Sequence, residues 1–141
     1  MELSSEGKGS RLTVEVTGGE FIEYPSLNLL VTVSDEGFCE ARSYAWVTLK
    51  DYKDFVAALR QCEQSRRGHA ILSGMSPSEL ELVVESSDNV GHFHLRYRLG
   101  RTSLASRTVQ AKAVTGGFDL DVEFFAQIVS GFAGLLPVTE T

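Results

Sequence analysis

Two histidines that lie two residues apart, His92 and His94, have a spacing suited to metal chemistry. On a β-strand this spacing places both imidazoles on one face, where they could bind a transition metal. A metal site needs a third or fourth ligand, and the strand expected opposite offers only Glu85. The pattern therefore favours a polar outer face, and a metal site, small-ligand site or small active site near His92 and His94 is the alternative.

Arg96 and Arg98 extend the same face and could hold a phosphate or an RNA strand together with the histidines. The glutamates expected opposite would neutralise them, and no aromatic side chain shares their face to stack on a base. The whole chain has a net charge of −6 and a pI near 5.0. Nucleic-acid and anionic-membrane binding need a basic surface, so we expect neither kind of partner.

Nucleophilic catalysis has no recognisable motif in this chain. Neither Cys39 nor Cys62 lies in an activating sequence context, and no serine lies in a Gly-x-Ser-x-Gly turn. The paired glycines lack the Lys-Ser/Thr of a phosphate loop. We expect a protein that is not an enzyme and that has no cofactor.

A strand expected over residues 38–47 carries the aromatic residues that could serve an interface. One face holds Phe38, Tyr44 and Trp46 with Glu40 and Arg42, and the other holds small side chains. Exposed aromatic residues are common anchors of protein interfaces. They are also suited to pack beneath helices as core. Core packing is the favoured alternative, and the sequence leaves both open.

Acidic residues are concentrated at the two ends of the chain. Residues 1–47 carry a net charge of −5 and residues 119–141 a net charge of −4. Such asymmetry can steer a basic protein partner, although a solvated acidic surface also has this composition. The candidate partner-binding residues are Glu15, Asp35, Glu36, Phe38, Glu40, Tyr44 and Trp46.

Hydrophobic periodicity predicts the elements that position these residues. Alternating apolar residues predict strands near 12–16, 27–33 and 38–47, and the spacing then becomes helical from Tyr52 to Cys62. Thr48 and Asp51 resemble a capping box at the start of this helix, and Cys62 lies on its apolar stripe. Further strands are expected near 69–73, 80–85, 93–99 and 103–114, with Gly116-Gly117 ending the last. A second helix follows, capped by Asp119 or Asp121, with apolar positions from Val122 to Leu136.

The strands at 80–85 and 93–99 predict a hairpin. With Asp88-Asn89 at the centre of its turn, Val84 lies opposite Phe93 and Leu82 opposite Leu95. On the other face, this register places glutamates opposite basic residues in the pairs Glu85 with His92, Glu81 with Arg96 and Glu79 with Arg98.

These elements predict an α+β fold with the order βββ-α-ββββ-α. We expect an antiparallel sheet of about six to seven strands with both helices packed on one face. Residues 1–10 are expected to be a flexible N-terminus and residues 11–137 a single domain. Two cysteines and no signal-like N-terminus predict a cytoplasmic protein, and an uncovered sheet face or edge would allow a monomer or a homodimer.

Several short motifs together resemble the WapI-type immunity proteins, a family of small bacterial proteins. The resemblance covers roughly residues 27–136 and rests on Trp46, Leu49-x-x-Tyr52-x-x-Phe55-x-x-x-Leu59, Arg67-Gly68-x-Ala70, Met75-Ser76-Pro77-x-Glu79-Leu80-x-Leu82, Gly91-His92-x-x-Leu95 and Phe118-x-Leu120-Asp121. It implies a non-enzymatic inhibitor that binds a cognate toxin domain, often a nuclease. It carries over no set of binding residues.

Overall fold

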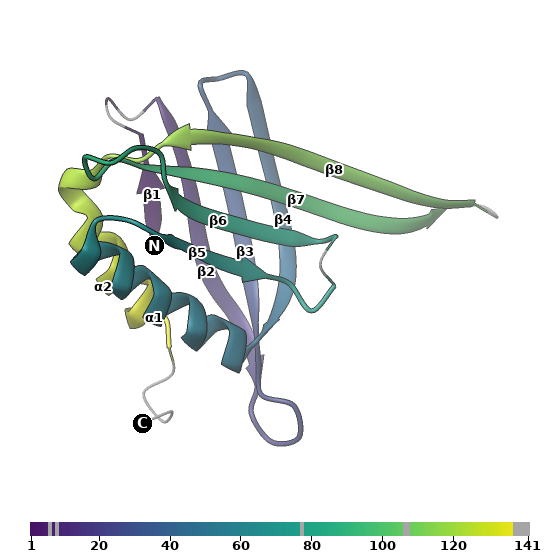
Figure 1. Cartoon of the computed structure of the whole chain (residues 1–141). Helices are drawn as coiled ribbons and strands as arrows, with labels where there is room; N and C mark the ends of the chain where they lie inside the picture. The colour runs from purple at the N-terminus through teal and green to yellow at the C-terminus, as the bar shows by residue number, and fades with distance from the viewer. Residues whose placement is uncertain (6, 8, 77, 106–107, 137–141) are drawn as a thin grey trace.

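Eight strands and two α-helices make up the part of the chain described by the computed structural model (Figure 1). That part comprises residues 1–5, 7, 9–76, 78–105 and 108–136. Residue 77 of the family-like motif and residue 137, the expected end of the domain, lie outside it.

The first four strands form an antiparallel N-terminal sheet in the order β1-β2-β3-β4. Their bounds are β1 Glu2–Ser4, β2 Ser10–Glu20, β3 Ser26–Asp35 and β4 Cys39–Thr48. Alternate residues are buried because period-two side chains point to opposite faces. The inner face of this sheet includes Leu12, Val14, Leu29, Val31, Val33, Ala45 and Val47.

The last four strands form an antiparallel C-terminal sheet in the order β5-β6-β7-β8. Their bounds are β5 His69–Ser73, β6 Leu80–Ser86, β7 Phe93–Ala105 and β8 Thr108–Asp119. The β6 pairing begins at Leu80, opposite Leu99. The Gly100 N–H still donates a 3.0 Å hydrogen bond to the Glu79 carbonyl, just before β6. Residues 100–105 of β7 pair with residues 108–113 of β8, and together they form a ribbon that projects from the molecule (Figure 1).

The prediction of one sheet of six to seven strands is therefore wrong, although the order of strands and helices is confirmed. The chain crosses from β4 to β5 through a helix, and β5 starts a new sheet instead of extending the first. The inner faces of both sheets contribute to one hydrophobic core. Each sheet thus covers much of the apolar surface that the helices were expected to cover alone.

The helices α1 (Leu49–Ser65) and α2 (Phe125–Gly134) lie together along one side of the two sheets (Figure 1). The predicted cap is confirmed, because the Thr48 hydroxyl accepts a hydrogen bond from the Asp51 N–H at 3.0 Å. The rings of Phe55 of α1 and Phe132 of α2 pack perpendicular to each other, and the Phe132 carbonyl accepts a 2.7 Å hydrogen bond from the Tyr52 hydroxyl. A 3-10 turn, η2 (Val122–Phe124), precedes α2.

The predicted hairpin forms, but its register is wrong by two residues. Val84 lies opposite Leu95 and Leu82 opposite Tyr97, while Glu85 lies opposite His94. A shift of two keeps every side chain on its face, so the hydrophobic pattern fits both registers equally well. The longer turn is closed by the Asp88 carboxylate, which accepts hydrogen bonds from the backbone N–H groups of Val90 and His92.

Two further expectations about strand ends are corrected. Gly116 and Gly117 do not end a strand but lie within β8, opposite Tyr97 and Arg96. A Cβ atom at position 116 would collide with the Tyr97 ring, so glycine leaves the space that this buried ring occupies. The strand expected over residues 103–114 is divided between the end of β7 and the start of β8, with positions 106–107 outside the described residues.

Part of the N-terminal segment expected to be flexible lies in β1. Leu3 pairs with Leu12 across to β2, and its side chain is fully buried. The alternation that reveals a strand needs several residues, and a three-residue strand is too short to produce it.

Candidate protein interface

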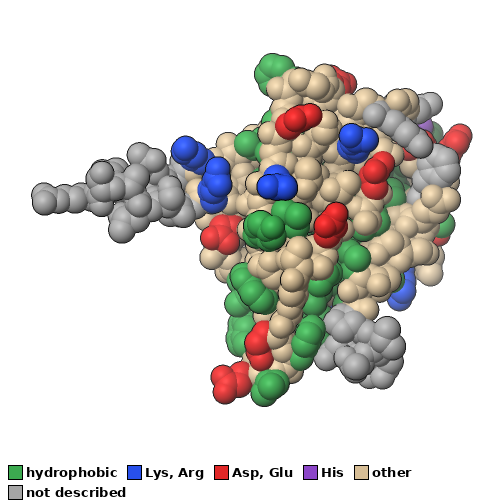
Figure 2. All heavy atoms as spheres, turned by 180° about the vertical axis from the view of Figure 1, so that it is seen from behind, with side chains coloured by type: hydrophobic (Ala, Val, Ile, Leu, Met, Phe, Trp, Pro, Cys, Tyr) green, Lys and Arg blue, Asp and Glu red, His purple; other side chains and the backbone are tan. Residues whose placement is uncertain are grey.

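The outer face of the N-terminal sheet brings together four of the predicted site residues. The register of β2, β3 and β4 places Glu15, Leu30 and Tyr44 in one row across the sheet. Trp46 lies one row further along β4, beside Asn28, and Glu40 lies two rows beyond Tyr44 in the other direction. No helix or strand of the described residues packs over this face (Figure 2).

The aromatic face of β4 is surface rather than core. The Tyr44 side chain is 58 % exposed and that of Trp46 is 42 % exposed, whereas Ala45 and Val47 are buried. The small residues point inward because β4 lies against β7 of the other sheet. The core alternative for these aromatics is therefore wrong.

The loop between β2 and β3 adds apolar side chains at the Trp46 end of this face, and the sequence interpretation missed it. The Glu20 carboxylate accepts hydrogen bonds from the backbone N–H groups of Ile22, Glu23 and Tyr24, which lower the pKa of Glu20. These bonds hold the loop in a defined shape, in which Ile22 is 91 % exposed. The signal in the sequence is the apolar run that follows Gly18-Gly19.

We call Phe21, Ile22, Tyr24, Tyr44, Trp46 and Met75 the aromatic patch. All six side chains are more than two-fifths exposed. Met75 belongs to this end of the sheet because its backbone N–H donates a 2.7 Å hydrogen bond to the Trp46 carbonyl. Figure 2 shows hydrophobic side chains gathered over the lower part of the outer face. Apolar clusters of this kind on a protein surface often mark interaction sites.

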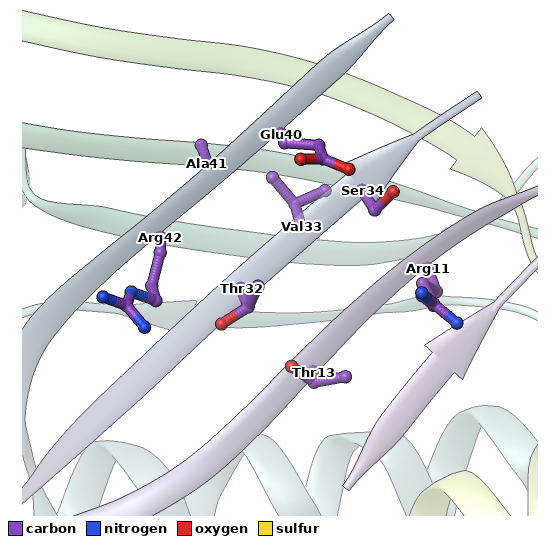
Figure 3. A pocket seen from close by; sticks show the side chains of 8 residues that line it. All are labelled: Arg11, Thr13, Thr32, Val33, Ser34, Glu40, Ala41 and Arg42. Atoms are coloured by element: carbon purple, nitrogen blue, oxygen red, sulfur yellow. The ribbon is translucent and has the colours of Figure 1, made fainter. Parts of the chain in front are cut away.

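The other half of the outer face is charged. A shallow hollow of about 370 Å³ lies among residues of β2, β3 and β4, including Arg11, Thr13, Thr32, Glu40 and Arg42 (Figure 3). The outer face therefore combines an apolar half with a half that carries both signs of charge.

The remaining predicted site residues lie where β3 turns into β4: Asp35 ends β3, and Glu36 and Phe38 lie in the turn. The Asp35 carboxylate accepts hydrogen bonds from the Ser10 hydroxyl at 2.6 Å and the Tyr97 hydroxyl at 2.8 Å. These bonds give Asp35 a structural role, since they link the two sheets. Phe38 is 95 % exposed and lies at the opposite end of β4 from Trp46.

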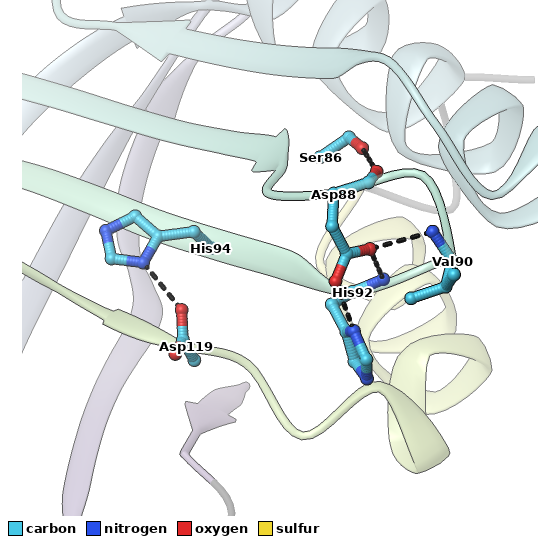
Figure 4. A network of polar contacts seen from close by, with 6 residues as sticks. All are labelled: Ser86, Asp88, Val90, His92, His94 and Asp119. Atoms are coloured by element: carbon cyan, nitrogen blue, oxygen red, sulfur yellow. Dashed lines mark hydrogen bonds and ion pairs between the residues drawn. The ribbon is translucent and has the colours of Figure 1, made fainter.

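An open groove of about 890 Å³ lies beside this turn. Its lining includes three predicted partner-binding residues, Asp35, Glu36 and Phe38. It also includes His92 and His94, the two histidines of the alternative metal or ligand site. Figure 4 shows the two imidazoles directed to separate partners, His92 to Asp88 and His94 to Asp119. Within the described residues, no group of three or more His, Cys, Asp and Glu side chains is arranged to hold a metal ion.

Glu85, the third ligand expected for such a metal, is engaged elsewhere. Its carboxylate accepts a 2.7 Å hydrogen bond from Arg96, which lowers the pKa of Glu85. The two-residue difference in register is the reason, because it places Glu85 beside His94 and Arg96 rather than opposite His92.

A comparison with protein families decides the identity of the chain. The model of the immunity protein WapI-like family matches residues 3–136. The chain belongs to this family. No curated protein and no solved structure matches it.

The cysteines of this WapI-like protein are free thiols in the structure. Cys62 is buried on the apolar side of α1, as its spacing predicts, and burial raises the pKa of its thiol. A raised pKa disfavours the reactive thiolate, which supports a packing role for Cys62. None of the helices described for this WapI-like protein is both long and apolar enough to cross a membrane.

Proposed function

We propose that this protein is a non-enzymatic immunity protein that neutralises a cognate toxin by binding it directly. Membership of the WapI-like family supports an immunity-type role. The single observation that carries the binding proposal is the aromatic patch, with Tyr44 and Trp46 exposed on a strand face. We place the toxin-binding surface on the outer face of the N-terminal sheet.

The backbone beneath this surface is held in place, which favours tight binding. Tyr44 and Trp46 stand on a paired strand, and the Glu20 carboxylate holds the adjacent loop. Large side chains on a fixed backbone lose little conformational freedom on binding, so more of their contact energy contributes to affinity. Tyrosine and tryptophan are also the residues most enriched among interface hot spots.

Charge supports a basic partner. The chain has a net charge of −6, and Glu15 and Glu40 are exposed on the outer face. The net negative charge of the chain attracts a basic toxin such as a nuclease over long distances and increases the rate of association. Inhibition follows from covering the toxin's active surface, and we expect it to occur in the cytoplasm, where both thiols remain reduced.

The first test is affinity capture of the tagged protein from the lysate of its native cell, with partners identified by mass spectrometry. We expect one stoichiometric basic toxin domain. Recovery of no specific partner while the cell expresses its toxins would contradict the proposal. Light scattering of the captured complex and of the free protein gives the stoichiometry and separates a monomer from a homodimer.

Point variants then locate the interface. Trp46→Ala is expected to weaken toxin binding by about 2 kcal/mol, roughly 30-fold, as is typical of a hot-spot aromatic residue. Phe38→Ala is the matched control, since Phe38 is an exposed aromatic residue at the other end of β4. A loss of affinity for Phe38→Ala with none for Trp46→Ala would place the interface at the β3–β4 turn.

The groove beside His92 and His94 supports one alternative, a small-ligand or enzymatic site. Its volume of about 890 Å³ is within the range of ligand pockets. Thermal unfolding in the presence of divalent metals and a metabolite library tests it, because a ligand that binds the folded state raises the unfolding temperature. Stabilisation that is lost in His94→Gln would favour this alternative over the toxin-binding proposal.

A further inference from the structure

The strand β4 has one free edge. It pairs with β3 on one side, and β4 is the last strand of its sheet. The Trp46 carbonyl accepts its hydrogen bond from Met75, outside the sheet, so the backbone groups of Trp46 point away from β3. Backbone direction alternates along a strand, and therefore those of Glu40, Arg42 and Tyr44 point to the same free edge.

These edge groups have no backbone partner among the residues that the structure describes. In the described part of the chain, the only hydrogen bond to these groups is a long 3.5 Å bond from the Ser43 hydroxyl to the Tyr44 carbonyl. Edge strands usually carry a device that prevents pairing with another chain. On β4 the Met75 contact covers the edge at Trp46, and the edge from Glu40 to Tyr44 stays open.

An open cleft of about 350 Å³ adjoins this edge. It is lined by residues 40–43 of β4 and by residues 99–101 and 112–114 of the β7–β8 ribbon. The cleft is therefore bounded on one side by unpaired backbone groups and on the other by the base of the ribbon.

The cleft is cationic although the whole chain is acidic. Arg42, Arg101 and Lys112 line it, and Glu40 is the only acidic residue among the described residues of its lining. Within the described residues none of the three basic side chains has an ion-pair partner. Arg101 and Lys112 lie directly opposite each other, an arrangement of like charges that is destabilising without a counter-charge. Figure 2 shows basic side chains beside the base of the projecting ribbon.

We propose that this cleft binds an extended acidic segment of a partner protein, which adds to β4 as a further strand. The free N–H and C=O groups of Glu40, Arg42 and Tyr44 supply the backbone hydrogen bonds of strand addition. Arg42, Arg101 and Lys112 supply the charge that selects acidic side chains. The site goes beyond the proposed toxin interface, which depends on the aromatic patch and a basic partner.

A peptide fits these features better than a nucleic acid. The backbone groups of β4 offer alternating donors and acceptors that an extended peptide matches and a phosphate backbone does not. The net charge of −6 also repels a long polyanion, whereas a short acidic segment contacts only the local basic cluster.

The test uses a fluorescein-labelled peptide of four Thr-Glu repeats, measured by fluorescence anisotropy at low salt. Two matched peptides serve as controls: the same sequence with every backbone amide N-methylated, and a Thr-Lys repeat of equal length. We expect binding of the Thr-Glu peptide alone. N-methylation keeps the charge but removes the donors that strand addition requires, so equal binding of the methylated peptide would overturn the proposal.

Protein variants separate this cleft from the rest of the surface. The double variant Arg101→Gln, Lys112→Gln is expected to weaken peptide binding by at least about tenfold, since it removes two charge-assisted hydrogen bonds. Arg98→Gln is the control, because Arg98 is also exposed on β7 but does not line the cleft. An equal loss of peptide affinity in both variants would indicate a non-specific charge effect and would rule out this cleft as the binding site.

Amide hydrogen exchange gives a structural readout of the same event. The peptide is expected to slow exchange at Glu40, Arg42 and Tyr44, the edge amides, and to leave the already paired amides of Ala41 and Ser43 unchanged. No binding of the acidic peptide, or equal binding of a single-stranded oligothymidylate, would contradict the proposal. Trp46→Ala should leave peptide binding intact. Failure of the acidic-peptide proposal can therefore be distinguished from failure of the toxin-interface proposal.

Discussion

The Tyr97 hydroxyl, on β7 of the C-terminal sheet, donates a 2.8 Å hydrogen bond to the Asp35 carboxylate at the end of β3. The same carboxylate accepts a 2.6 Å hydrogen bond from Ser10 of β2. One acidic side chain thus connects three strands of two sheets that share no strand pairing. Ser10 and Asp35 also line the groove beside the β3–β4 turn.

Replacement of Tyr97 by phenylalanine should destabilise the protein. The variant keeps the buried ring and loses the hydrogen bond, and bonds to charged groups contribute about 1.5–3 kcal/mol. We expect a decrease of this size in the free energy of unfolding, measured by urea denaturation at neutral pH. An unchanged free energy of unfolding would show that solvent replaces the hydroxyl without loss.

Stability should fall at alkaline pH. Burial raises the pKa of Tyr52, and burial together with the Asp35 carboxylate raises the pKa of Tyr97. Below about pH 10, the ordinary value for tyrosine, both residues are protonated in the folded and unfolded states and their contribution is fully present. Above it the unfolded phenols ionise first, so each group lowers the free energy of unfolding by up to about 1.4 kcal/mol per pH unit.

The measurement is urea denaturation between pH 8 and pH 11 at constant ionic strength, a range set by the ordinary tyrosine pKa of about 10. Tyr97→Phe removes one of the two titrating groups and should make the decline less steep. If the free energy of unfolding declines equally steeply in this variant, groups other than Tyr97 cause the loss of stability at alkaline pH.

Replacement of Gly116 by alanine should displace the Tyr97 ring. The new Cβ would collide with the hydroxyl and ring carbons of Tyr97, and overpacking of this kind costs about 1–3 kcal/mol. Gly134→Ala is the control, because nothing lies within 4 Å of a Cβ at the end of α2. We expect thermal unfolding to show a lower melting temperature for Gly116→Ala and an equal or higher one for Gly134→Ala.

Replacement of Asp88 by alanine should loosen the turn between β6 and β7. Its carboxylate accepts hydrogen bonds from the backbone N–H groups of Val90 and His92. Asp88→Ala should therefore accelerate amide hydrogen exchange at both residues, while Asp88→Asn, which keeps an acceptor oxygen, should largely preserve their protection. If the two variants exchange alike, the turn is held by its backbone bonds rather than by this side chain.

The sequence alone determined the class and order of the elements. Period-two alternation identified β3, β4 and β6, because side chains of a strand point alternately to opposite faces whatever lies beside them. Helical spacing and the Thr48 cap identified the start of α1, since both depend on contacts within a few residues of the chain. Four of the seven predicted interface residues, Glu15, Glu40, Tyr44 and Trp46, share the outer face because their strands were identified correctly.

Only the tertiary structure decided which surfaces meet. Alternation gives two faces of β4 but not which one is buried, and the packing of β4 against β7 selects the small-residue face. The alternation of apolar residues likewise fits two hairpin registers that differ by two residues, and the turn held by Asp88 selects one of them. The division into two sheets, the Asp35–Tyr97 connection and the cationic cleft beside β4 all join residues far apart in the chain, and no local pattern encodes such contacts.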